Sequence, residues 1–240
     1  MGLVASEGCC TVDGRERPRL RCLVDLDAPC NLKCLHCPRP SRGALDEGQR
    51  GASAAERVIE RIEASGAEAV GVAFYGGEPL LVIDRLVEDS AALQEFCTWR
   101  GIQYRGGLVT NGTLLDGHTA RLLRASGITR ALVTLAGPPP FHDRQRPLAE
   151  GGPSFDRILS NVALARHWID VMIRFDASDP SHLGPLSPLL RFLDREGLLV
   201  GRRPLELLVH RMSGYAAQAR LLLDAEDGAL TLDPDGGAIA

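Results

Sequence analysis

Three cysteines lie close enough in the sequence to bind one metal centre. Cys30, Cys34 and Cys37 form a C-x3-C-x2-C pattern in the segment PCNLKCLHCP. Thiolates are soft ligands that favour iron–sulfur clusters, and a [4Fe–4S] cube takes one cysteine per iron. Three cysteines would therefore leave one iron open. An open coordination position is a property of reactive metal centres, whereas structural centres are closed.

Two other interpretations of these cysteines remain open. His36 or Cys22 could complete a structural zinc site, or the three thiols could bind nothing. His36 is next to Cys37 in the sequence, which makes it awkward for both side chains to bind one tetrahedral metal. We expect Cys22 and Cys97 to be buried core thiols.

The two remaining cysteines, Cys9 and Cys10, could be redox-active thiols or have no role. All seven cysteines lie at or before Cys97. The N-terminal residues lack the cationic start and the apolar stretch of a secretion signal, so thiols or metal ligands are expected rather than disulfides.

A glycine pair and a glutamate follow the second apolar run of the chain. Gly76, Gly77 and Glu78 lie in the segment FYGGEPLL. Glycines let a backbone approach a ligand closely, and a carboxylate can accept a charge-assisted hydrogen bond from an ammonium group. The segment could instead be an ordinary turn. Asn111, in TNGTLL, offers the same choice between a pocket residue and a turn.

Three further polar residues accompany later apolar runs. Thr134 ends the run ALVT, and Arg146 lies in the segment FHDRQRP that follows it. A guanidinium can bind a carboxylate through two parallel hydrogen bonds. Arg174 lies in the run VMIRF, where a surface salt bridge is the alternative to a binding role.

Short apolar runs alternate with amphipathic segments from residue 20 onward, which predicts an α/β fold with a parallel sheet. We expect six strands, at 20–27, 69–75, 103–110, 130–135, 170–175 and 205–210. We expect helices at 53–65, 83–98, 116–126, 154–167 and 184–196, four of them followed by a glycine typical of a helix end.

Six β/α units are too few for a closed eight-stranded barrel, so the sequence predicts an open, partial (β/α)6 TIM-like barrel. Ligands bind at the carboxyl ends of the strands in such folds. The long connection at 136–153 is expected to be an active-site loop. We expect an N-terminal arm at 1–19, the barrel at 20–210 and a short C-terminal appendage at 211–240.

The composition excludes several classes of function. The 240 residues are 45% hydrophobic, enough for a full core. A formal charge of -4 gives no excess of cations to attract nucleic acid or an anionic membrane. The longest apolar runs are far shorter than the roughly 20 residues of a membrane span. We therefore expect a cytoplasmic protein that binds neither nucleic acid nor membrane.

In their order along the chain, these motifs resemble the radical S-adenosylmethionine (SAM) superfamily, and in particular its peptide- and protein-modifying maturases. The resemblance runs from about residue 20 to about residue 210. It implies that Cys30, Cys34 and Cys37 hold a [4Fe–4S] cluster whose open iron binds the amino and carboxylate groups of SAM. Reductive cleavage of SAM then gives a 5′-deoxyadenosyl radical, which abstracts a hydrogen atom from the substrate.

The resemblance also implies how the other residues serve SAM. His36 would pack near the adenine. The carboxylate of Glu78, held behind Gly76 and Gly77, would bind the ammonium group. Asn111 would line the SAM or substrate pocket.

A second group of contacts follows from the later motifs. Thr134 and Arg146 would contact the SAM carboxylate, and Arg174 would lie near the ribose. Ala136 stands where the maturase pattern has an aspartate, which puts any contact made by that aspartate in doubt. No catalytic acid, base or radical-quenching residue is named by this pattern.

Partners follow from the same resemblance. We expect a peptide or protein substrate, an external electron donor such as flavodoxin or ferredoxin, and a separate protein for any leader recognition. Residues 228–236 resemble the hairpin that opens a SPASM or twitch extension, but no cysteine accompanies them, so the appendage is expected to be truncated or degenerate. Catalytically silent scaffolds for SAM or peptide, and a structural zinc protein, are the alternatives. The bond formed in the substrate stays open.

Overall fold

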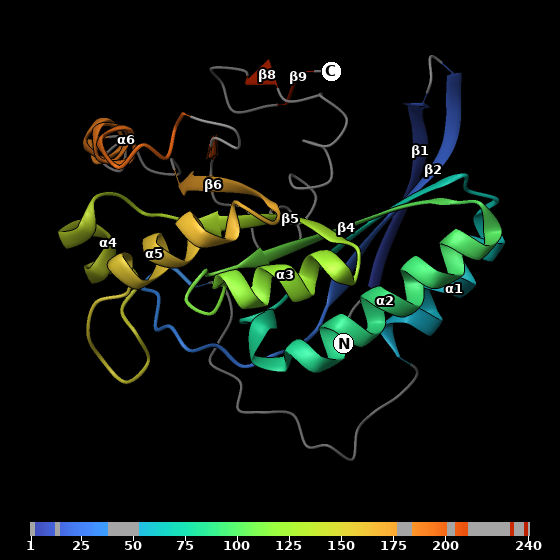
Figure 1. Cartoon of the computed structure of the whole chain (residues 1–240), viewed down its shortest axis with the longest axis horizontal. Coiled ribbons are helices and arrows are strands. Elements are labelled where there is room, and N and C mark those ends of the chain that lie inside the picture. Colours follow the sequence, from blue (N-terminus) through green and yellow to red (C-terminus); the bar gives the residue numbers. More distant parts are fainter. Residues whose placement is uncertain are drawn as a thin grey trace.

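A seven-stranded sheet forms the centre of the molecule. The computed structural model describes residues 3–12, 15–37, 53–176, 184–200, 205–210, 231–232 and 238–239. Strands β2 to β7 are parallel and lie in sequence order, and β1 pairs antiparallel with β2 at the edge (Figure 1). The strands are β1 (Leu3–Val12), β2 (Arg15–Asp25), β3 (Ala69–Tyr75), β4 (Gln103–Thr110), β5 (Ile128–Thr134), β6 (Asp170–Asp176) and β7 (Glu206–His210).

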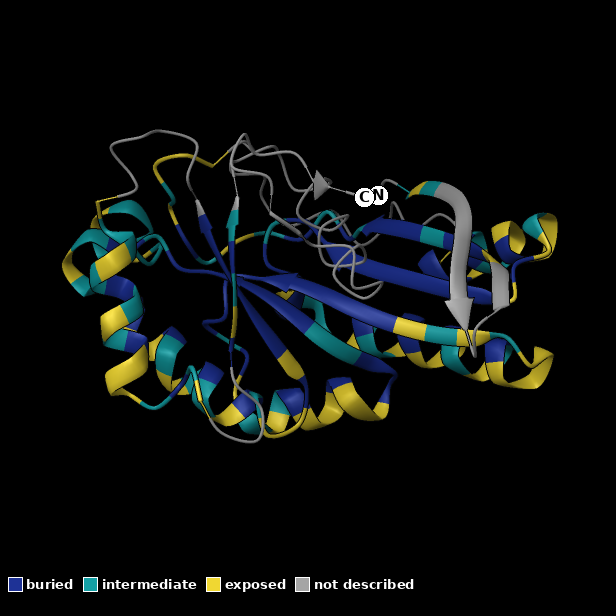
Figure 2. Cartoon of the chain, turned by 90° about the horizontal axis from the view of Figure 1, so that it is seen from above, coloured by how far each residue is buried: buried dark blue, intermediate teal, exposed yellow. Residues whose placement is uncertain are grey.

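Helices follow one face of the curved sheet (Figure 2). At the start of the first helix, Ser53 and Glu56 form a capping box that satisfies two backbone N–H groups. The helices are α1 (Ala54–Ser65), α2 (Ile83–Arg100), α3 (Gly117–Ala125), α4 (Pro139–Gln145), α5 (Phe155–Ala165) and α6 (Leu186–Arg195), and a short 3₁₀ helix, η2 (Pro79–Val82), precedes α2.

Alternation along the strands sorts the apolar side chains into two layers. The larger layer lies between the sheet and the helices and contains Phe74, Phe155 and Phe175, all fully buried. Burial of such a side chain stabilises the fold by about 1.5–3 kcal/mol, so this layer fixes the strand ends that carry the site. A second layer consists of Leu23, Ala73, Tyr75, Val109, Leu132, Met172 and Leu208.

The predicted α/β fold with a partial (β/α)6 barrel is confirmed. Each predicted strand is present, and β3 and β4 have the predicted bounds. The five predicted helices are present as α1, α2, α3, α5 and α6, with ends shifted by a few residues at most. Among the residues described, no helix is both long and apolar enough to cross a membrane.

The N-terminal residues that were expected to form an arm belong to the sheet where the structure describes them. Residues 3–12 form β1, and β2 begins at Arg15 instead of residue 20. A strand at the edge of a sheet leaves a row of backbone groups unpaired, and β1 supplies partners for those of β2. Leu3 and Ala5 also pack against the larger core layer.

The connection at 136–153 is also more ordered than a loop, because it contains α4. This helix begins behind Pro138 with prolines in its first turn, where the missing N–H costs nothing. Of residues 211–240, the structure describes only β8 (Thr231–Leu232) and β9 (Ala238–Ile239), which pair antiparallel. The division into arm, barrel and appendage therefore stays a prediction.

Candidate active site

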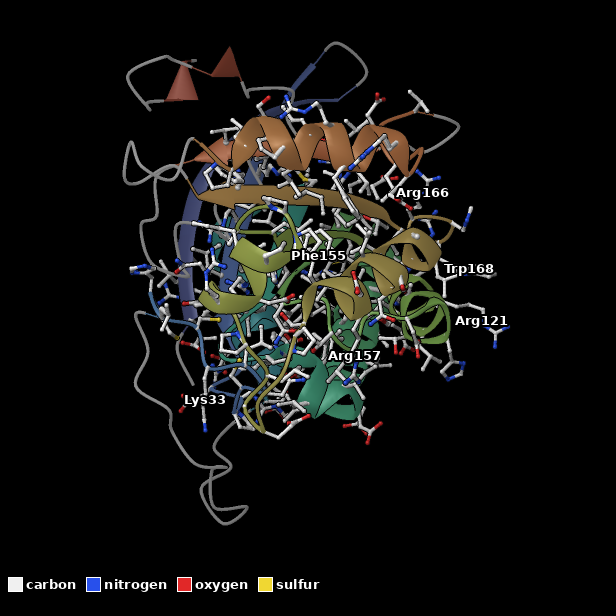
Figure 3. All side chains as sticks on the ribbon, turned by 90° about the vertical axis from the view of Figure 1, so that its left-hand side faces the viewer. Lys33, Arg121, Phe155, Arg157, Arg166 and Trp168 are labelled. Atoms are coloured by element: carbon white, nitrogen blue, oxygen red, sulfur yellow. The ribbon has the colours of Figure 1, made fainter. Side chains whose placement is uncertain are left out.

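The carboxyl ends of four neighbouring strands carry the segments predicted to form the site. Residues 26–37 follow β2, residues 76–78 follow β3, residues 111–113 follow β4, and Thr134 ends β5. Figure 3 views the molecule from the side toward which these strands run, with Lys33 on the first of these segments. We call residues 29–37 the cluster loop.

The three cysteines of the cluster loop are thiols that solvent can reach. Cys30 and Cys37 are exposed and Cys34 is partly exposed. Cys30 is exposed as a residue, but the protein around its sulfur desolvates the thiolate and so raises the pKa of the thiol. A backbone hydrogen bond from Leu32 partly offsets this rise. In the described part of the chain, no group of three His, Cys, Asp or Glu side chains is gathered for a metal ion.

The glycine pair after β3 brings a second backbone segment against the cluster loop. Gly76 and Gly77 have φ angles of 109° and 54°, which side chains disfavour. A Cβ atom at Gly77 would lie 1.9 Å from the carbonyl oxygen of Ala28 and 2.5 Å from that of Pro29. The neighbour that requires Gly77 is therefore protein backbone, whereas the sequence suggested a ligand.

Glu78 is a fully buried carboxyl held by three protein donors. Its side-chain oxygens accept hydrogen bonds from the Thr110 hydroxyl at 2.7 Å and from the backbone N–H groups of Asn111 at 2.7 Å and Leu80 at 3.1 Å. Burial raises the pKa of Glu78, and these hydrogen bonds offset part of that rise. A carboxylate has about four acceptor positions, and these donors occupy three of them.

Asn111 connects the end of β4 to the cluster loop. Its side-chain nitrogen donates to Asn31 Oδ1 at 2.8 Å and lies 3.8 Å from the Cys30 sulfur. The Asn31 amide in turn donates to the Thr113 hydroxyl at 2.9 Å. The sequence offered two roles for Asn111, a pocket residue or a turn residue. The structure adds a third, because Asn111 contacts the segment that carries the cysteines.

Residues 145–149, which begin at the last residue of α4, form the second support of the cluster loop, and we call them the pairing segment. The N–H groups of Lys33 and Leu35 donate to the carbonyls of Pro147 and Gln145, each at 2.9 Å. Leu32 and Leu148 form an antiparallel bridge between the two segments. These backbone contacts were not visible in the sequence.

Arg146 belongs to the pairing segment. Its Nε atom is buried and makes no hydrogen bond in the described part of the chain. Burial raises the pKa of Glu78, and the charge of Arg146 offsets a part of that rise; burial lowers the pKa of His142, and the charge of Arg146 lowers it further. The structure thus places a cation and a buried carboxyl near each other beside the cluster loop.

His142 anchors the pairing segment from α4. The side chain is fully buried, and burial together with the charge of Arg146 lowers its pKa to about 3. Its Nδ1 accepts from the N–H of Ala136 at 3.2 Å, and its Nε2 is 3.1 Å from the Ser154 hydroxyl. Because Ser154 donates its own proton to the Arg146 carbonyl at 2.6 Å, Nε2 is the donor in the contact with Ser154, and the imidazole is neutral.

Thr134 and Arg174 pair across the ends of β5 and β6. Arg174 is only 2% exposed, and its Nε donates to the Thr134 hydroxyl at 3.2 Å. Arg174 is therefore not a surface residue. His36 lies exposed on the cluster loop, and its contact with adenine stays a prediction.

The remaining cysteines lie elsewhere. Cys22 and Cys97 are fully buried in the helix-side layer, as expected, and burial raises their pKa values to about 12 and about 11. A thiol in that environment is poorly suited to be the fourth ligand of a zinc site. The side chains of Cys9 and Cys10 lie outside the described residues.

A family model described as the radical SAM superfamily matches residues 29–174, more than half of the chain. The chain belongs to the radical SAM superfamily. Enzymes of this superfamily use a [4Fe–4S] cluster and SAM, which confirms the predicted cofactors at the level of the family. The matched residues begin at the cluster loop and end at Arg174, so they include every residue predicted to serve the cofactors.

Curated relatives of this radical SAM protein have several functions. An uncharacterized protein of Methanocaldococcus jannaschii is 26% identical over 88% of this chain and 63% of its own. An AdoMet-dependent heme synthase of Methanosarcina barkeri is 31% identical over 59% of this chain and 38% of its own. A serine-type anaerobic sulfatase-maturating enzyme of Klebsiella aerogenes is 30% identical over 59% and 35%. The chain thus spans less than two thirds of each relative.

Solved structures share the fold of this radical SAM protein. Native anSMEcpe with bound AdoMet and a Cp18Cys peptide has a TM-score of 0.61 and 19% identity, over 80% of this chain and 50% of the other. HydG, a maturase of the [FeFe]-hydrogenase, has a TM-score of 0.53 and 17% identity, over 91% and 46%. At these identities the likeness concerns the fold.

The residues at the strand ends fit the two cofactors of the superfamily. The cluster loop offers three reachable sulfurs, the ligand type that iron–sulfur clusters require. Arg146 offers a buried Nε–H that has no hydrogen-bond partner among the described residues and is suited to a carboxylate, and the carboxylate of Glu78 is suited to an ammonium group. These are the two charged groups at the methionine end of SAM.

Proposed function

We propose that this chain is a radical SAM enzyme that modifies a peptide or protein. The proposal rests on one observation. Backbone hydrogen bonds join the cluster loop to the backbone of Glu78 on one side and to the pairing segment on the other. These contacts bring three sulfurs, an anion and a cation to one end of the sheet. An iron–sulfur cluster and the zwitterionic end of SAM need that combination.

Each residue has a distinct task in this proposal. Cys30, Cys34 and Cys37 bind the cluster as thiolates and leave the fourth iron open. Glu78 accepts a hydrogen bond from the ammonium group of SAM, and Arg146 donates a hydrogen bond to the carboxylate of the same SAM molecule. A cluster held by these residues would supply the electron for reductive cleavage of SAM to methionine and a 5′-deoxyadenosyl radical, and that radical would take a hydrogen atom from the substrate.

Residues at the ends of the neighbouring strands position the rest of SAM in this proposal. The hydroxyl of Thr134 contacts the carboxylate in this proposal, and its hydrogen bond with Arg174 fixes the position of that hydroxyl. Arg174 serves the ribose side, and His36 packs against the adenine from the cluster loop. Gly76 and Gly77 keep the turn close to the loop, so that Glu78 stays within reach.

A peptide substrate is favoured by two relationships. Sulfatase-maturating enzymes are among the relatives, and one structure of the same fold contains a bound peptide. Heme synthase and Fe-coproporphyrin III synthase are relatives of comparable identity, so a tetrapyrrole is the competing substrate class. A flavodoxin or ferredoxin would supply electrons, and a separate protein would bind any leader.

The two substrate classes can be distinguished by isotope transfer. Reconstituted enzyme is incubated with SAM, a reductant and peptides deuterated at carbon, with candidate sequences taken from short genes beside the gene for this chain. Deuterium in the 5′-deoxyadenosine, detected by mass spectrometry, supports a peptide substrate. Turnover of Fe-coproporphyrin III, with no transfer from any peptide, would contradict it. A chain that binds SAM but yields no 5′-deoxyadenosine would instead be a silent scaffold.

A further inference from the structure

The orientation of the Asn111 side chain is fixed by its partners. Its oxygen accepts from the Thr113 hydroxyl at 2.6 Å and from the Thr113 backbone N–H at 2.9 Å. A backbone N–H can only donate, so the oxygen of the amide must face Thr113. The NH₂ group is thereby turned toward the cluster loop.

This NH₂ group has two neighbours on the cluster loop. One is Asn31 Oδ1 at 2.8 Å and the other is the Cys30 sulfur at 3.8 Å. Because an amide nitrogen carries two hydrogens, one can donate to each neighbour. The hydrogen bond from Asn31 to Thr113 closes a ring of three side chains, and the backbone N–H of Thr113 by itself keeps the oxygen of the amide turned away from the sulfur.

Two of the three residues of the ring are buried, and Asn31 is partly exposed. Asn111 is 5% exposed and Thr113 is 1% exposed. In such surroundings a hydrogen bond is electrostatically stronger than it is in water, and a network of satisfied partners keeps a single arrangement. The amide of Asn111 is therefore a preformed donor beside one proposed cluster ligand.

We propose that Asn111 is a positioning residue that raises the reduction potential of the cluster by donating an N–H to the sulfur of Cys30. The inference rests on the proposed function, and it differs from the expected contact of Asn111 with SAM or substrate. Hydrogen bonds to cluster sulfurs are among the factors that set reduction potentials. Reduction adds negative charge to the cluster and its sulfurs, so an N–H donor favours the reduced form.

The test is a redox titration of the reconstituted full chain without SAM, followed by electron paramagnetic resonance. Asn111→Leu removes the donor at similar volume, and we expect a more negative midpoint potential. Asn111→Asp also introduces a negative charge, so its potential should be more negative still. Thr113→Val is the matched control: it loses the hydroxyl but keeps the backbone N–H that orients Asn111, and its potential should equal that of the unaltered chain.

Two results would overturn the inference. One is a midpoint potential of Asn111→Leu equal to that of the unaltered chain; with weakened SAM binding, this outcome would make Asn111 a SAM contact. The other is an equal shift in Thr113→Val, which would indicate general loosening of the loop. Failure of the unaltered chain to take up a cluster is a different result, because it would contradict the proposed function itself.

A second measurement needs no substitution. The chain contains three asparagines, Asn31, Asn111 and Asn161, and the side chains of Asn31 and Asn161 donate to Thr113 and Gly112 instead of a sulfur. In protein labelled with ¹⁵N only in asparagine side-chain amides, pulsed resonance of the reduced cluster should detect a ¹⁵N coupling. Absence of that coupling would overturn the inference even if the variants do not fold.

Discussion

The backbone N–H of Ala149 donates to the carbonyl of Asn31 at 2.9 Å. With two further backbone bonds, it ties the loop that carries the cysteines to a segment far away in the sequence. Arg146 belongs to that segment. The hydrogen bonds that position the cluster loop therefore also position the segment that carries the guanidinium proposed to bind SAM. A displacement of the loop should displace this segment, and the reverse.

Replacing Cys30, Cys34 or Cys37 by Ala removes one of three ligands, and we expect the loss of both the brown cluster and SAM cleavage. Iron and acid-labile sulfide analysis after anaerobic reconstitution measures the first effect. Cys97→Ser is the matched control, because this thiol is buried in the core layer and should not bind iron. A Cys34→Ala protein with unchanged iron and SAM cleavage would refute the ligand assignment.

Arg146→Gln removes the cation proposed to bind the SAM carboxylate. A hydrogen bond to a charged group contributes about 1.5–3 kcal/mol, so SAM affinity should fall about 10- to 100-fold. Equilibrium dialysis of the reconstituted protein measures this affinity. Arg144→Gln is the control, since Arg144 is exposed and two residues away. Equal affinities for the two variants would remove Arg146 from the SAM site.

The sequence predicted the sheet well, because runs such as 69–75 are apolar throughout and end at glycines. It missed β1, although Asp13-Gly14 between two extended runs is a hairpin signal. It also missed α4. Prolines suggest a loop when their position is ignored, but these prolines occupy the first turn of the helix, where proline is tolerated. In both cases, partners distant in the sequence or position within an element decided the structure.

The candidate site was predictable residue by residue but not as an arrangement. The types of Cys30, Glu78 and Arg146 indicate their chemistry, whereas the backbone pairing of residues 31–35 with 145–149 leaves no trace in side-chain pattern. Gly77 shows the same limit. Its neighbour is the backbone at Ala28 and Pro29, and backbone atoms are the same for every sequence.

Gly77→Ala should be far more destabilising than Gly66→Ala, although both glycines have positive φ. Nothing lies within 4 Å of a Cβ at Gly66, while a Cβ at Gly77 meets the carbonyl of Ala28 at 1.9 Å. The left-handed conformation alone costs about 1–2 kcal/mol, and the clash should raise the cost at Gly77 above about 4 kcal/mol. Urea unfolding of the apo-protein checks this, and similar losses in the two variants would contradict the close approach.

His142 should make stability depend on pH. Burial lowers its pKa to about 3, whereas the unfolded chain binds a proton near pH 6.5. Between these values the unfolded state holds more protons, so stability is full above about pH 6.5 and falls by about 1.4 kcal/mol per pH unit below it. Unfolding at pH 7, 6 and 5 should show this slope, and His142→Gln should lack that part of it. Identical slopes would mean that His142 is charged in the folded state.

The most direct test of the account is the reductive cleavage of SAM by the anaerobically reconstituted chain. With iron, sulfide, SAM and dithionite, the account predicts a [4Fe–4S] signal that changes when SAM is added, together with 5′-deoxyadenosine and methionine measured by liquid chromatography. A preparation with one bound zinc and no acid-labile sulfide, or one with an intact cluster and no 5′-deoxyadenosine, would contradict it.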